Sequence, residues 1–180
     1  MKGTNRHCFD PETGRTISRE LSLKDALLIK QMNMNAVRSH YPPDTHFLEA
    51  CDSIGLLYLN ELCGWQNSYS TEIAEKLLPE MMFRDVNHPC IFIWANGNEG
   101  GWNAAVDNRF ADYDPQKRHV IHPWADFNGL DTRHYPNGTD NMYRLERGHK
   151  VFMMTEFLHG LYDRGQGAGL KGLWSKFKAN

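Results

Sequence analysis

Short apolar runs alternate along the chain with longer segments in which apolar residues recur every three or four positions. This alternation is typical of repeated βα units, so it predicts a parallel sheet covered by helices. The strand-like runs cover residues 3–7, 36–39, 56–60, 90–95, 119–122, 130–133 and 151–155. The helical spacing covers residues 22–31, 44–53, 70–84, 102–111 and 140–147, with a further candidate at 169–180.

The ends of two helices carry recognisable signals. Ser22 and Asp44 are expected N-caps, because their side-chain oxygens can accept a hydrogen bond from a free backbone N–H. Gly55 follows the second segment and is expected to stop that helix, since glycine tolerates the left-handed conformation there.

Seven strands with intervening helices predict an α/β fold, a (β/α)8 TIM barrel that is incomplete. Such a barrel typically takes about 250 residues, whereas this chain has 180 and about seven of the eight strands. We therefore expect residues 1–180 to form one catalytic barrel domain that lacks its last strand, and truncation explains the shortfall.

Polar residues follow several of the predicted strands. In a parallel barrel the C-terminal strand ends meet on one face, and active sites are built there. The residues that reach this face are His7, His40, Glu61, Glu99 and Glu156. Glu99 enters a glycine turn directly after an apolar run, and Glu156 ends another such run.

Two glutamates at strand ends point to glycoside hydrolysis. That reaction needs one carboxylic acid to protonate the leaving oxygen and one carboxylate to attack the sugar or activate water. Glu99 and Glu156 suit these roles, and Asn98 is placed to hydrogen-bond a sugar hydroxyl. Sugar rings could stack on tryptophans, although core packing explains most of them: Trp65, Trp94, Trp102 and Trp124.

We predict supporting roles for several histidine and arginine side chains near the predicted strand ends. His7 and His40 are expected to bind sugar hydroxyls, while Arg6 and Arg38 are expected to orient the glutamates by charge-assisted hydrogen bonds. The nine histidines show no HExxH or comparable ligand spacing. We expect no metal and no cofactor, and a metallohydrolase ranks below a glycosidase.

The net charge and the lengths of the apolar runs limit the kinds of partner that this chain is expected to bind. A net charge of -2 and a pI near 6.5 give no reason to expect nucleic acid or an anionic membrane. No apolar run approaches the roughly 20 residues of a spanning helix, so a water-soluble chain with a carbohydrate substrate is expected. No signal peptide is visible, which leaves the compartment open between cytoplasm and periplasm. The four cysteines form no CxxC pair and are expected to be free thiols.

Five segments, in this order, resemble the catalytic barrel of glycoside hydrolase family 2, the β-galactosidase and β-glucuronidase family. They are Lys2-Gly3-Thr4-Asn5-Arg6-His7, Asn35-Ala36-Val37-Arg38-Ser39-His40-Tyr41-Pro42, Arg84-Asp85-Val86-Asn87-His88-Pro89, Asn98-Glu99 and Thr155-Glu156-Phe157-Leu158-His159-Gly160.

The resemblance implies a retaining double displacement on a TIM barrel. Glu99 matches the acid/base and Glu156 the nucleophile, while His7 and His40 match substrate-contacting histidines. Tyr135 matches a tyrosine that hydrogen-bonds the nucleophile.

The segment at residues 155–160 is more similar to β-galactosidases than to β-glucuronidases. The alternatives are a β-glucuronidase-like or β-mannosidase-like specificity, or a catalytically inactive fragment. We expect the family's β-sandwich domains and last barrel strand to be absent from this chain, so the missing domains or self-association are the expected partners. The family's magnesium ligands would fall at Gly64 and Gln66, which predicts no magnesium there.

Overall fold

The computed structural model describes residues 1–135, 150–158 and 169–179 of the chain. By their internal contacts the residues form two compact units, Met1–His122 and Pro123–Asn180. The helix predicted at residues 140–147 lies outside the described residues. Among the helices that are described, none is long and apolar enough to cross a membrane.

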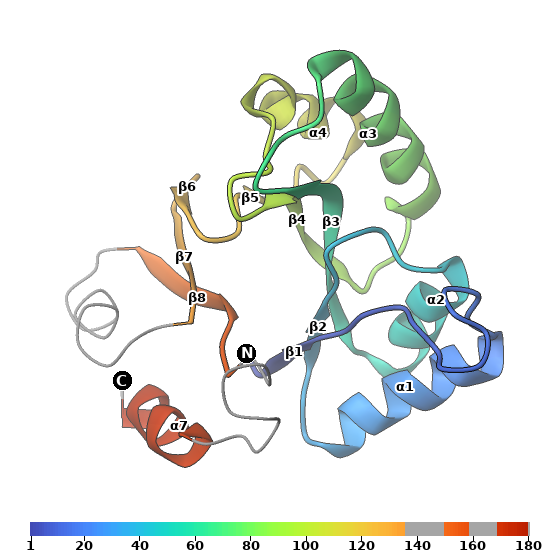
Figure 1. Ribbon diagram of the computed structural model, residues 1–180, viewed down its shortest axis with the longest axis vertical. Helices are drawn as coiled ribbons and strands as arrows, with labels where there is room; N and C mark the ends of the chain where they lie inside the picture. The colour runs from blue at the N-terminus through green and yellow to red at the C-terminus, as the bar shows by residue number, and fades with distance from the viewer. Residues whose placement is uncertain (136–149, 159–168, 180) are drawn as a thin grey trace. The chain divides into compact units, whose positions relative to one another are not determined.

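The first unit is built on a five-stranded parallel sheet (Figure 1). Its strands are β1 (Gly3–Asn5), β2 (Ala36–Arg38), β3 (Leu57–Trp65), β4 (Ile91–Asn98) and β5 (Val120–Ile121). Each strand pairs in parallel with the next in sequence. Spatial order therefore equals chain order, as in the wall of a βα barrel.

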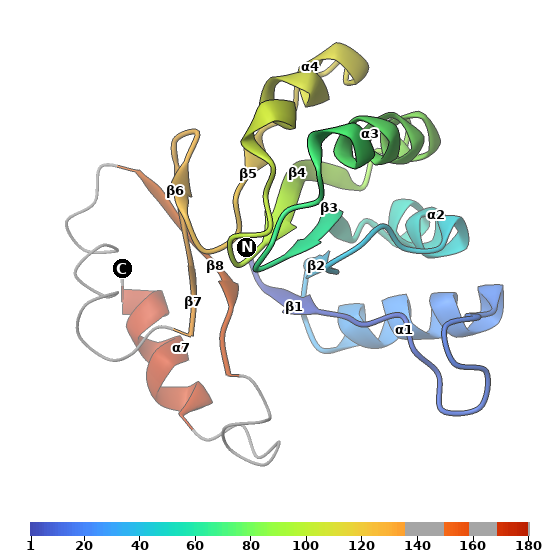
Figure 2. The ribbon, with the colours of Figure 1, turned by 45° about the horizontal axis from the view of Figure 1, so that its top comes forward.

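Helices cover one face of this sheet, as Figure 2 shows. They are α1 (Arg19–Gln31), α2 (Thr45–Ile54), α3 (Thr71–Asp85), the 3-10 helix η1 (Ala104–Arg109) and α4 (Phe110–Tyr113). The core between helices and sheet is apolar and almost fully buried, and its largest members include Phe47, Leu48, Tyr58, Leu78, Met82, Trp94 and Phe110. Removing these side chains from water drives the packing of the helices on the sheet.

The predicted caps were right for α2 and wrong for α1. Asp44 is the N-cap of α2, without a side-chain hydrogen bond, and Gly55 ends that helix in the left-handed conformation at φ 68°. Helix α1 begins earlier than predicted, because the Ser18 side chain accepts a hydrogen bond from the Leu21 N–H at 3.1 Å. Ser22 is instead a buried residue of the first turn.

Strand β3 is longer than its apolar run predicted. It continues to Trp65 because it stays paired with β4, where Trp65 is the partner of Asn98. Glu61 therefore lies inside β3 and is fully buried, so its predicted place at a strand end was wrong.

The segment predicted as one helix at residues 102–111 is two short helices. The Asn103 side chain accepts a hydrogen bond from the Ala105 N–H at 3.0 Å, which starts the tight η1 turn. The Asn103 backbone N–H also donates to the Asn96 side chain at 3.3 Å, which ties the start of η1 to β4. The α-helical part begins only at Phe110.

The second unit contains a smaller sheet in the order β6-β7-β8. Strands β7 (Leu130–His134) and β8 (Val151–Glu156) are parallel, in agreement with their prediction, and the helix α7 (Leu170–Ala179) follows. The sequence did not predict β6 (Asp126–Phe127), which pairs antiparallel with β7 across a turn at Asn128 and Gly129.

Candidate active site

Glu99 directly follows the last residue of β4 and has a left-handed backbone at φ 47°. A non-glycine residue with positive φ is uncommon, and such strain persists where the surroundings fix the residue. Gly100 continues the turn at φ 93°, and the Gly101 N–H donates to the Asn98 carbonyl at 2.8 Å. Glu99 therefore lies in a turn directly beyond the buried strand β4.

The Glu99 carboxylate is held by a neighbouring strand. The indole Nε1–H of Trp65, the last residue of β3, donates to Glu99 Oε2 at 2.9 Å. The Trp65 residue is 65% exposed, so the hydrogen bond lies at the surface of the first unit. The sequence had suggested only sugar stacking or core packing for this tryptophan.

A buried polar network lies beneath Glu99. The Arg38 guanidinium donates to Glu61 Oε2 from Nε at 3.0 Å and from Nη2 at 2.7 Å. Arg38 Nη2 also donates to the Asn98 side-chain oxygen at 2.7 Å. The network joins β2, β3 and β4 and fixes which end of the Asn98 amide accepts, so that its NH₂ group is the donating end.

His7 and His40 lie close together, as the sequence predicted for a shared strand-end face. Their ring centroids are 5.1 Å apart, and His7 Nδ1 is 3.2 Å from the Tyr41 hydroxyl. His40 Nδ1 lies 3.8 Å from Oε1 of Glu61, which connects this pair to the buried network. Both imidazoles follow β1 and β2, which places them at the same end of the sheet as Glu99.

Arg6 has a different partner from the one predicted. Its Nε and Nη2 donate to Asp25 Oδ2 in α1 at 2.9 and 2.7 Å, and its guanidinium lies over the Phe47 ring at 4.1 Å. Within the first unit Arg6 therefore ties β1 to the helix layer, and Arg38 alone of the two arginines binds a glutamate there.

In the second unit, Tyr135 and Glu156 are joined twice. The Tyr135 hydroxyl donates to Glu156 Oε2, and the Tyr135 backbone N–H donates to the Glu156 carbonyl at 2.9 Å. The contact that the sequence predicted for Tyr135 is therefore present. Tyr135 directly follows β7 and has a left-handed backbone at φ 45°.

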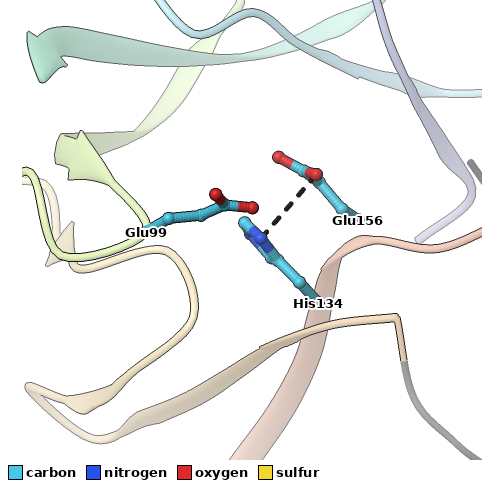
Figure 3. A group of neighbouring side chains, drawn as sticks. All are labelled: Glu99, His134 and Glu156. Atoms are coloured by element: carbon cyan, nitrogen blue, oxygen red, sulfur yellow. Dashed lines mark ion pairs between the residues drawn. The ribbon is translucent and has the colours of Figure 1, made fainter. Parts of the chain in front are cut away.

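His134 also contacts Glu156, although the sequence gave it no role in the site. Its Nδ1 lies 3.7 Å from Glu156 Oε2, the ion pair that Figure 3 marks. The His134 ring stacks on Trp124 with 5.7 Å between centroids and 3° between planes. His134 is the strand partner of Glu156 in the β7–β8 pair. The contact could have been predicted only with this strand register known, and the sequence alone does not provide it.

The two positions that the sequence assigned to the family's magnesium ligands, Gly64 and Gln66, lie at the end of β3 and directly after it. Gly64 has no side chain to offer, and the Trp65 indole N–H already donates to the Glu99 carboxylate. A cation prefers oxygen ligands, and an N–H donor cannot serve as one. The absence of magnesium at these positions stays a prediction.

The sequence of this chain is similar to those of known proteins. Residues 1–115 match the family described as "Glycosyl hydrolases family 2, TIM barrel domain". A β-galactosidase of Thermoanaerobacter pseudethanolicus is 33% identical over 92% of this chain and 21% of its own length. A β-galactosidase of Thermoanaerobacterium thermosulfurigenes is 44% identical over 52% of this chain and 14% of its own length. The matched part of this chain thus spans 21% or less of the length of these relatives.

Two solved structures have a similar fold. A GH2 β-galacturonidase from Eisenbergiella tayi matches with a TM-score of 0.73 and 23% identity over 87% of this chain and 35% of its own. A β-glucuronidase from Faecalibacterium prausnitzii matches with a TM-score of 0.71 and 26% identity over 87% of this chain and 34% of its own.

Proposed function

Because this chain belongs to glycoside hydrolase family 2, as its sequence predicted, we propose that it carries the two catalytic glutamates of a retaining β-galactosidase. Glu99 acts as the acid/base and Glu156 as the nucleophile. The observation that supports Glu156 most directly is its hydrogen bond from the Tyr135 hydroxyl, which fixes one carboxylate oxygen.

In the first step a Glu156 oxygen attacks the anomeric carbon and forms a glycosyl ester. The bond from that carbon to the leaving oxygen breaks, and the Glu99 carboxyl gives its proton to this oxygen, so that the alcohol leaves neutral. In the second step Glu99 takes a proton from water, the resulting hydroxide attacks the anomeric carbon, and the ester bond to Glu156 breaks. Two inversions give net retention.

The contacts of Glu156 suit a nucleophile. A carboxylate that accepts a hydrogen bond is held in one orientation, and Tyr135 supplies such a bond at Oε2. The hydroxyl is the donor in this bond, because an ionised carboxylate can only accept.

The polar residues around Glu99 suit sugar recognition. Arg38 holds the Asn98 oxygen, so the Asn98 NH₂ group is the end that donates to a sugar hydroxyl next to the reacting carbon. His7 and His40 form a pair of imidazoles that can donate to or accept from further hydroxyls. Hydrogen bonds to a sugar hydroxyl that strengthen in the transition state contribute to catalysis.

Galactose is the proposed sugar because the curated relatives at 33% and 44% identity are β-galactosidases. A β-glucuronide is the competing substrate, since a solved β-glucuronidase shares the fold at 26% identity. A β-mannoside is the third substrate to compare. The experiment measures nitrophenol release from the three β-glycosides by the purified chain.

The matched variants are Glu156→Gln and Glu72→Gln. Glu72 is an exposed glutamate of α3 that pairs only with Lys76 among the described residues. Turnover of the galactoside by the wild type and Glu72→Gln, with none by Glu156→Gln, is the expected result. If Glu156→Gln turned over the galactoside as fast as the wild type, the proposal would be contradicted. If the wild type and both variants turned over none of the glycosides, the result would favour a catalytically inactive fragment.

A further inference from the structure

Trp65 contacts Glu99 but has no role in the two reaction steps proposed above. We propose that Trp65 positions the acid/base Glu99 by donating its indole N–H to one carboxylate oxygen. The inference rests on the proposed role of Glu99. The contact itself, from Trp65 Nε1 to Glu99 Oε2 at 2.9 Å, lies within the first unit.

Core packing does not account for this tryptophan. A buried tryptophan directs its N–H to a partner because the group would otherwise be unsatisfied. Trp94 is such a case: it is fully buried and donates to Asp114 Oδ2 at 2.9 Å. Trp65 is 65% exposed, so water could satisfy its N–H, yet the ring is turned to a glutamate 34 positions away.

The backbone around this pair is built for close approach. A Cβ on Gly64 would lie 2.2 Å from the Gly101 carbonyl oxygen, and one on Gly101 would lie 2.3 Å from Trp65 N. A Cβ on Gly97 would lie 2.4 Å from the Gly101 carbonyl carbon. The three glycines thus let the end of β3 rest against the turn that carries Glu99.

Hydrogen bonds along the same backbone fix the register. The Gln66 N–H donates to the Asn98 carbonyl at 3.2 Å, and Trp65 is the strand partner of Asn98. Gln66 and Glu99 both have left-handed backbones, at φ 59° and 47°. The indole and the carboxylate are therefore set side by side by the main chain, before any substrate is present.

The chemistry of the indole suits this position. An indole N–H can only donate a hydrogen bond, whether the carboxyl group beside it is ionised or protonated. With Oε2 of Glu99 engaged by Trp65, the carboxyl group is held in one orientation for giving a proton to the leaving group and for taking one from water. A misplaced acid lowers the rate most when the leaving group needs protonation.

The first test observes the contact without activity. In the ¹⁵N-labelled chain, Trp65→Phe identifies the Trp65 indole resonance by its disappearance. This resonance should shift during an acid titration, and the shift should vanish in Glu99→Gln. The Trp94 indole, which is bonded to Asp114, serves as the folding control and should be unchanged by Glu99→Gln. A Trp65 resonance with the same titration in wild type and Glu99→Gln would overturn the proposal.

The second test separates positioning from folding by the leaving group. Trp65→Phe should lower kcat/KM for an alkyl β-galactoside about tenfold more than for a dinitrophenyl β-galactoside, whose leaving group needs little protonation. Equal losses on both substrates would overturn the positioning role. If the wild type hydrolyses neither substrate, the proposed function fails, and the indole titration still decides whether Trp65 holds Glu99.

Discussion

Arg38 Nη2 donates to the carboxylate of Glu61 and to the side-chain oxygen of Asn98, at 2.7 Å in each case. One guanidinium thereby connects three neighbouring strands directly beneath the residue that precedes Glu99. Arg38 is 4% exposed and Glu61 is fully buried, so this ion pair is shielded from water. We expect it to determine both the stability of the sheet and the orientation of Asn98.

Glu61→Gln should be strongly destabilising. Removing one partner of a buried ion pair leaves the other charge uncompensated, which typically costs about 3–5 kcal/mol. Urea unfolding of the variant and wild type measures the difference. Glu72→Gln, which breaks the exposed pair with Lys76, should change stability by no more than about 0.5 kcal/mol. Equal losses in the two variants would contradict a special role for the Arg38–Glu61 pair.

Gly101→Ala should destabilise the first unit through a backbone clash. The added Cβ would lie 2.3 Å from the Gly64 carbonyl carbon, and such overpacking typically costs about 1–3 kcal/mol. Gly14→Ala is the matched control, because Gly14 has φ 65° and open space for a Cβ. Thermal unfolding followed by circular dichroism should show a larger loss for Gly101→Ala, and the opposite order would contradict the close packing.

The Cys51 thiol should resist alkylation in the folded chain. Burial, followed by the nearby Asp52 charge, raises the pKa of Cys51 from its ordinary 9.0 to about 12, so the reactive thiolate is scarce at pH 8. Cys63 is partly exposed and serves as the comparison. Mass spectrometry after iodoacetamide treatment should find Cys63 modified before Cys51, and equal rates would show that Cys51 is accessible.

The same pKa shift predicts a loss of stability in alkali. Above the ordinary pKa of 9.0 the unfolded chain releases the Cys51 proton while the folded chain keeps it up to about pH 12. Stability from this group is thus complete below pH 9.0 and is lost as the pH rises toward 12. Cys51→Ser should lessen the decline in urea-unfolding free energy between these pH values, whereas an identical decline would assign it to other groups.

Tyr135→Phe should lower turnover without preventing folding. It removes the hydroxyl that donates to Glu156, and loss of one oriented donor at a reacting group typically costs about 10²-fold in kcat. Tyr69→Phe is the control, since Tyr69 is an exposed residue of the first unit. Initial rates on nitrophenyl β-galactoside should fall for Tyr135→Phe alone; unchanged rates in both variants would remove Tyr135 from the mechanism.

The sequence predicted most of the fold because strands and helices follow from local periodicity. All seven predicted strands are present, and the parallel order follows from their alternation with helices. The errors occur where tertiary contacts decide. Ser18 rather than Ser22 begins α1, and β3 extends to Trp65 because β4 offers partners beyond the apolar run.

The candidate site was predictable where a residue follows a strand, and less so where its partner is distant in sequence. Glu99, Glu156, His7 and His40 were placed by that rule. Arg6 lies beside His7 but binds Asp25 of α1, because the fold brings that carboxylate to within 2.9 Å of its guanidinium. The contact of Trp65 with Glu99 required the glycine packing that only the folded backbone reveals.

Trapping the glycosyl ester tests the central claim most directly. A 2-deoxy-2-fluoro-β-galactoside with an activated leaving group slows both steps but slows hydrolysis of the ester more, so a covalent intermediate accumulates on the nucleophile. The purified chain is incubated with this compound, digested and analysed by mass spectrometry. We predict one added fluorosugar on the peptide that contains Glu156, and none in Glu156→Gln. A fluorosugar on another residue, or an unmodified chain, would contradict the assignment of Glu156 as the nucleophile.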